Sequence, residues 1–254
     1  MSTMIVTPGI TSLVSERDLA PLPEVARRCL RGAGVCDRPR HTSFRVESSG
    51  WFRMKPGGRR VACSTWQVTS GPKIARAFVM TMRFGGLIPL VARDTYGHGH
   101  GRMRGRLLDH FTVIDARGPE LDAGELVTWL NDALMFAPSM LLVPGITWSP
   151  VDRRAFDVAV TDGGCTVSAR VTVDDRGAPI DFSTEDRYRY EGHGPTAHWV
   201  RQRWSTPMGG WRVLHGRRIP SYGRAIWHTP HGDFVYAELH PHAETLAYNV
   251  PPPD

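Results

Sequence analysis

Short stretches in which apolar and polar residues alternate fill most of this chain, and each stretch ends at glycine, proline or aspartate. The stretches 61–68 and 75–84, for example, are separated by the turn sequence Ser-Gly-Pro at 70–72. Alternation with a period of two is typical of β-strands with one buried face, and breaks of this composition are typical of hairpins. Further stretches of this kind lie at 156–161, 165–173, 180–190, 198–204, 222–228, 234–239 and 246–250. The chain is therefore predicted to fold mainly as an antiparallel meander.

Two segments show helical periodicity instead. Pro23 precedes the first, at 24–30, because proline suits the first helical turn. The second has Asp122 as its predicted N-cap and Glu125 three residues later, and apolar residues recur at spacings of three and four over 126–134. The predicted fold class is α+β: about ten antiparallel strands curl into a half-barrel or cup around one or two helices.

The chain has 254 residues, a net charge of +6 and 41% hydrophobic residues, which is the composition of a globular protein. We expect a flexible leader at 1–20, a single curved-sheet domain at 21–250 and a tail at 251–254. Only Lys55 and Lys73 are lysines, so almost all of the basic residues are arginines. These arginines are spread along the chain and matched locally by acids, so no nucleic-acid partner is expected.

The first ten residues lack the basic segment and the long apolar core of a secretory signal. The longest apolar stretch, 134–148, is interrupted by two prolines and is shorter than a membrane span. None of the four cysteines forms a Cys-x-x-Cys pair. A cytoplasmic protein without a membrane span is expected, and its oligomeric state is left open.

Several segments together resemble a large, uncharacterised bacterial family classed as a domain of unknown function. The similar segments are 22–35, 52–58, 99–103, 105–108 and 115–148, with Trp227, Gly232, Asp233 and Tyr236 near the end. The resemblance covers about residues 21–250. Members look similar to the curved-sheet fold of lipoprotein carriers, so the resemblance implies an antiparallel half-barrel over helices with an apolar cavity. It implies no particular reaction.

The segment 94–104 is the first candidate site. If it lies in one extended stretch over 87–108, alternation places six polar residues on one face: Asp94, Tyr96, His98, His100, Arg102 and Arg104. The opposite face then carries Met103 and three glycines, against which a helix or a ligand can pack closely. The polar face is either a catalytic floor, with His98 or His100 as a base oriented by Asp94, or simply a solvated surface.

Later strands supply the other candidates. Arg187, His228 and Tyr236 are candidates for stabilising charge or donating a proton. The predicted ligand-binding residues are Tyr96, Met103, Tyr188, Trp199 and Trp227. The aromatic residues among them suit either the wall of a cavity or an ordinary core.

Neither a metal nor another cofactor is expected. His98 and His100 form a His-x-His pair, which His240 and His242 repeat, but no third ligand follows at a fixed spacing. The sequence also lacks a phosphate-binding loop, a nucleophile elbow and a dinucleotide fingerprint.

Two functions remain open. The first is a cofactor-independent acid–base enzyme of the cyclase, isomerase or lyase type, acting on a largely apolar small molecule held in the sheet cavity. The second is a non-catalytic carrier or binding protein for a lipid or another hydrophobic ligand. In both, the partner is a hydrophobic small molecule.

Overall fold

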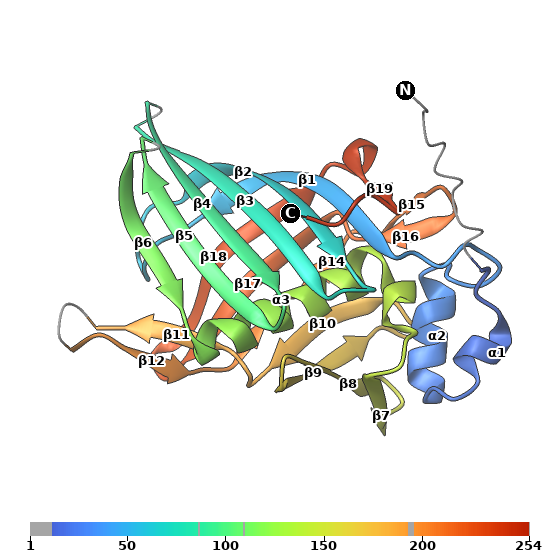
Figure 1. The fold of residues 1–254 in the computed structure, drawn as a ribbon. Coiled ribbons are helices and arrows are strands. Elements are labelled where there is room, and N and C mark those ends of the chain that lie inside the picture. The colour runs from blue at the N-terminus through green and yellow to red at the C-terminus, as the bar shows by residue number, and fades with distance from the viewer. Residues whose placement is uncertain (1–11, 86, 109, 193–195, 254) are drawn as a thin grey trace.

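One continuous antiparallel sheet forms the framework of the protein (Figure 1). The computed structural model describes residues 12–85, 87–108, 110–192 and 196–253. The first group of strands is β1 (Ser43–Phe52), β2 (Val61–Ser70), β3 (Ala75–Phe84), β4 (Ile88–Gly97), β5 (His100–Leu107) and β6 (Phe111–Arg117). The second group is β7 (Ile146–Asp152), β8 (Ala155–Asp162), β9 (Cys165–Val173) and β10 (Pro179–Thr184).

The C-terminal strands join these two groups. The order across the sheet is β6-β5-β4-β3-β2-β1-β18-β17-β13-β10-β9-β8-β7, so β18 (Gly232–Pro241) pairs with β1, and β17 (Tyr222–Thr229) lies beside β13 (Trp204–Ser205). Two small strands lie off this path, β14 (Met208–Gly209) and β19 (Ala247–Tyr248). Separate hairpins are formed by β11 (Tyr188–Glu191) with β12 (His198–Arg201) and by β15 (Arg212–Leu214) with β16 (Arg217–Ile219).

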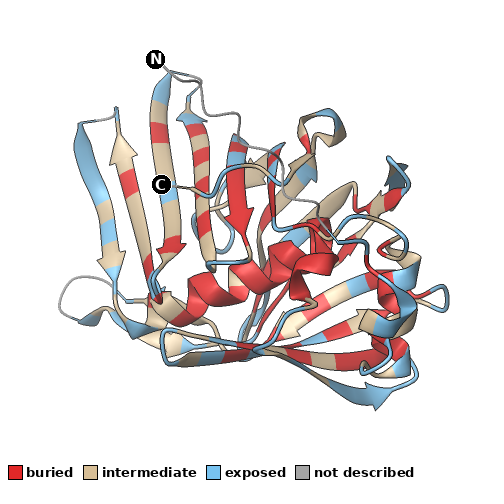
Figure 2. Cartoon of the chain, turned by 45° about the vertical axis from the view of Figure 1, so that its right-hand side comes forward, coloured by how far each residue is buried: buried red, intermediate tan, exposed pale blue. Residues whose placement is uncertain are grey.

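The sheet curls around one long helix, α3 (Pro119–Phe136) (Figure 1). In Figure 2 this helix is red along almost its whole length, because nearly every residue from Leu121 to Phe136 is buried. A helix that buries residues on all sides, as this one does, lies inside a core. The Trp129 indole N–H also donates a hydrogen bond to the Ser70 carbonyl (2.7 Å), which fixes the helix to the end of β2.

The predicted fold class is confirmed: an antiparallel sheet forms a half-barrel around a helix. Helix α2 (Glu24–Gly32) begins after Pro23, as expected. Helix α3 begins earlier than predicted, with Gly118 as N-cap and Pro119 in the first turn, so Asp122 lies inside the helix and is not its cap. In the part of the chain that the structure describes, short 3-10 helices lie at Pro138–Leu141 and Ala243–Thr245.

Residues 12–20 differ from the expected flexible leader. They include α1 (Glu16–Leu19), and Val14 and Leu19 are fully buried in a small core with Leu30 and Val35. Residues 1–11 lie outside the described residues. Among the residues that the structure describes, no helix is long and apolar enough to cross a membrane.

Candidate functional site

A cavity of about 710 Å³ lies between the concave face of the sheet and helix α3. This volume is within the range of small-molecule sites, about 300–1,000 Å³. Strands β1, β3, β5 and β18 supply much of its apolar wall, with the side chains Phe52, Phe78, Met80, Met103, Phe234 and Leu239. The strands provide these side chains because alternate residues of each strand point to the concave face.

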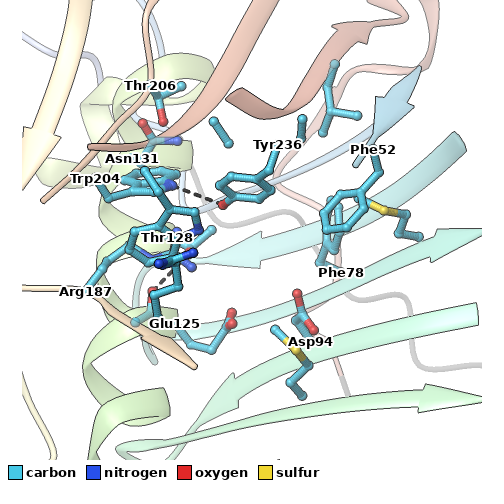
Figure 3. A pocket seen from close by; sticks show the side chains of 18 of the residues that line it. Phe52, Phe78, Asp94, Glu125, Thr128, Asn131, Arg187, Trp204, Thr206 and Tyr236 are labelled. Carbon is cyan, nitrogen blue, oxygen red and sulfur yellow. Dashed lines mark hydrogen bonds between the residues drawn. The ribbon is translucent and has the colours of Figure 1, made fainter. Parts of the chain in front are cut away.

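Aromatic rings form a second part of the wall (Figure 3). The Tyr236 ring stacks on Trp227, with the centroids 6.0 Å apart, and meets Phe52 edge to face at 5.6 Å. The Trp204 indole N–H donates a hydrogen bond to the Tyr236 hydroxyl oxygen (3.0 Å). The Arg187 guanidinium lies over the Trp204 ring, 4.4 Å from its centroid, in a cation–π contact.

A buried group of charges lies where the cavity meets α3. Arg76 of β3 donates to Glu125 and to Asp132, both at 2.9 Å. The side chains of Arg76 and Glu125 are only 4% and 3% exposed. The Gln67 amide also donates to Asp132, at 3.4 Å. Buried charges are tolerated only when they are paired in this way, so Arg76 holds α3 against the sheet.

Two carboxyl groups of the cavity have raised pKa values. Burial and the neighbouring Asp94 raise the pKa of Glu125 to about 7, against the attraction of Arg76 and Arg187. Burial raises the pKa of Asp94 as well, although the same two arginines oppose the shift. Asp94 Oδ1 has no hydrogen-bond partner among the described residues. Two carboxyl groups in one cavity, each retaining a proton more readily than usual, have the properties of acid–base groups.

Seven of the residues singled out from the sequence line this cavity: Asp94, Met103, Arg187, Tyr188, Trp199, Trp227 and Tyr236. They come from segments that are far apart in the sequence, and the pairing of β18 with β1 brings Tyr236 and Trp227 into the same sheet as Asp94 and Met103. Tyr188 and Trp199 belong to the β11–β12 hairpin.

His98 and His100 are not among the residues that line the cavity. The expected single extended stretch is instead the hairpin β4–β5, in which Gly97 pairs with His100. His98 and Gly99 both have positive φ angles, 54° and 82°, as a two-residue type I′ turn requires. The His100 side chain is 81% exposed and lies 3.3 Å from Asp122, not beside Asp94.

The expected polar face over 94–104 is therefore wrong. Because the chain reverses at the turn, Asp94 lies opposite Met103, and both line the cavity. Arg102 and Arg104 alternate with Met103 and point to the outer face. Gly101 packs directly on helix α3, where a Cβ atom would come within 2.5 Å of the Leu121 carbonyl oxygen. The glycine face thus receives the helix.

Tyr96 and His228 are also outside the cavity lining. Tyr96 is buried, and its hydroxyl donates to Asp162 of β8 (2.9 Å), so it joins two distant hairpins. His228 of β17 contacts Ser205 through Nε2 (2.8 Å) and Asp233 through Nδ1 (2.7 Å).

This Ser205–His228–Asp233 chain has the order of contacts of a catalytic triad. Ser205, however, is only 2% exposed, and none of the three residues lines the cavity, since Ser205 alternates with the cavity residues Trp204 and Thr206. A buried hydroxyl cannot reach a substrate. The contacts therefore join β13, β17 and β18.

The charges that pair across the cavity floor, Arg76, Glu125 and Asp132, were not predicted from the sequence as a buried group. The sequence contained one sign of this group. Arg76, Phe78 and Met80 are alternate residues of β3, so the Arg76 side chain points to the apolar face. A charged residue on such a face needs a buried partner. Among the described residues, no cluster of three or more His, Cys, Asp or Glu side chains is arranged to hold a metal ion.

Three solved structures are similar to this chain at very low sequence identity. A LolA superfamily protein from Nitrosomonas europaea has 9% identity and a TM-score of 0.45, and covers 89% of this chain and 94% of its own. A putative outer membrane lipoprotein-sorting protein domain from Vibrio parahaemolyticus has 8% identity, coverage of 89% and 92%, and a TM-score of 0.40. A DUF1329 family protein from Desulfovibrio piger has 13% identity, coverage of 89% and 91%, and a TM-score of 0.42.

No curated protein matches the sequence. Residues 12–239 match the family described as "Family of unknown function (DUF6544)". This match covers most of the chain and confirms the expected resemblance to an uncharacterised family. The chain belongs to the DUF6544 family.

Proposed function

We propose that this protein binds a hydrophobic small molecule in the cavity between the sheet and α3. The observation that carries the proposal is the cavity itself: about 710 Å³ of space whose wall is largely aromatic and aliphatic. An apolar ligand that packs against this wall removes apolar surface from water, which is favourable. The binding function is the alternative that the sequence left open.

The first prediction concerns filling this cavity. Met103→Trp places a large ring inside it, because Met103 points inward from β5. We expect delipidated wild-type protein to bind the neutral dye Nile red, and Met103→Trp to weaken this binding about tenfold or more, since the dye and the new ring compete for one space. Fluorescence titration measures both affinities.

Arg104→Trp is the matched control, because it adds the same ring to the outer face of the same strand. It is expected to bind Nile red like the wild type. If both variants bind the dye as tightly as the wild type, the dye site is not this cavity. If the wild type does not bind it, the proposed binding function fails.

A second candidate is the cofactor-independent acid–base enzyme, a cyclase, isomerase or lyase. Asp94 and Glu125 support it, because both carboxyl groups line the cavity and both have raised pKa values. They take the place of the histidines that the sequence suggested as bases.

The test of the enzyme begins with the compound that copurifies with the protein. That compound is incubated at high concentration with wild type, Asp94→Asn and Glu125→Gln, and its mass and NMR spectrum are followed. If the wild type converts the compound and neither variant does, the result supports the enzyme. Recovery of the unchanged compound from the wild type supports binding alone.

A further inference from the structure

Arg187 is a positive charge without a hydrogen-bonding partner for its side chain among the described residues. Its Nε atom is buried and unpaired, and no described carboxylate lies within ion-pair distance of the guanidinium. The guanidinium instead lies between aromatic rings, 4.4 Å from the centroid of Trp204 and 5.6 Å from that of Trp227. The residue is half-buried, and a guanidinium that loses part of its water without gaining an acceptor is destabilised. The N–H groups of Arg187 are therefore available to donate hydrogen bonds to an acceptor group of a ligand.

Tyr236 supplies a second donor beside it. Its hydroxyl oxygen accepts the hydrogen bond from Trp204, and its own hydrogen has no acceptor among the described residues. Figure 3 shows Tyr236 and Arg187 facing the same part of the cavity, with Glu125 and Asp94 below them in the view. A guanidinium next to a free hydroxyl is well suited to the two oxygens of a carboxylate.

Three other arginines of the cavity lining are already paired with carboxylates: Arg76, Arg189 with Glu191, and Arg224 with Glu238. Arg76 donates to both Glu125 and Asp132, so it has no strong need of a further acceptor. Arg53 and Lys55 also line the cavity, but Arg187 is the cation that lies against Trp204, whose indole N–H bonds the Tyr236 hydroxyl. The apolar wall formed by Phe52, Phe78 and Met80 continues from this point and suits a hydrocarbon tail.

We propose that Arg187 and Tyr236 bind the carboxylate of a long-chain carboxylic acid whose tail lies along the apolar wall. This inference rests on the proposed binding function and adds the chemical class of the ligand. A single negative charge suits the site better than a phosphate dianion, because three carboxyl groups, Asp94, Glu125 and Asp132, already lie nearby.

The test compares three compounds with the same tail and different heads: dodecanoic acid, dodecanol and dodecylamine. Each displaces Nile red from delipidated protein at neutral pH. The wild type is expected to bind the acid about tenfold or more tightly than the alcohol, because a charge-assisted hydrogen bond is lost with the carboxylate. The amine is expected to bind no better than the alcohol.

Arg187→Met keeps an unbranched side chain but removes the guanidinium, and is expected to abolish the preference for the acid over the alcohol. Tyr236→Phe is expected to reduce the preference in part. Arg60→Met is the matched control, because Arg60 also lies over a tryptophan, Trp51, with 4.2 Å to the ring centroid, and does not line the cavity.

Equal binding of acid and alcohol by the wild type, or tighter binding of the amine, overturns the inference. The inference is also overturned if Arg187→Met weakens the binding of the acid and of the alcohol equally, since structural damage would have that result. These outcomes leave the binding function standing, because Nile red still binds. Failure of the wild type to bind Nile red and all three compounds overturns the binding function as well.

Discussion

Single residues decide the chemistry of this cavity, and Glu125 is the clearest case. From the sequence it was interpreted as part of a helix cap, whereas in the structure it is buried and accepts a hydrogen bond from Arg76. The reason is positional: α3 starts at Pro119, so Glu125 falls in the helix interior. Arg187, Tyr236 and Asp94 were chosen from the sequence and do line the cavity; Asp94 lies in β4 and Tyr236 in β18, whereas Arg187 lies between β10 and β11.

Glu125 also makes a prediction about pH. Its pKa is raised from 4.5 to about 7, so between these values the folded state binds more protons than the unfolded chain. The free energy of unfolding attributable to Glu125 therefore falls as pH rises through this window. Glu125→Gln removes this titration. The free energy of unfolding of the variant minus that of the wild type is therefore expected to increase from about pH 4.5 to about pH 7. Urea unfolding across this range measures it, and a pH-independent difference contradicts the assignment.

At the scale of elements, the strands were predictable and one turn was not. Alternation correctly indicated β2, β3, β8 and β9, because each has one buried face. The β4–β5 turn was missed because its central residues are His98 and Gly99, and the usual signal for a type I′ turn is Asn-Gly or Asp-Gly. Because this turn was missed, each residue of the predicted stretch after it, up to Arg104, was assigned to the wrong face of the sheet.

The contact between β5 and α3 gives a prediction at this scale. Gly101→Ala puts a methyl group against the backbone of Leu121, and is expected to lower the free energy of unfolding by about 1–3 kcal/mol. Gly97→Ala, in the same hairpin, meets no atom within 4 Å and is expected to change it by less than about 0.5 kcal/mol. Chemical denaturation of both variants measures the difference, and equal stabilities contradict the close approach.

At the scale of the whole molecule, the architecture of the sheet depends on the pairing of β18 with β1. It joins two groups of strands into one sheet and brings Tyr236 and Trp227 to the cavity that Asp94 lines. The sequence predicted a curled meander, but it gave no sign of this pairing, since β1 and β18 are far apart along the chain and their alternation fits many partners. The expected cytoplasmic location and the absence of a nucleic-acid partner stay predictions.

The most direct test of the binding function is a crystal structure of the protein with an omega-bromododecanoic acid, in which bromine is located by its anomalous scattering. The binding function predicts a bromine peak inside the cavity, near Phe78 and Met80, and the further inference predicts the carboxylate at Arg187. Bromine in the cavity with the carboxylate elsewhere contradicts only the inference. A cavity filled by the protein's own side chains, with bromine bound outside it, contradicts the binding function itself.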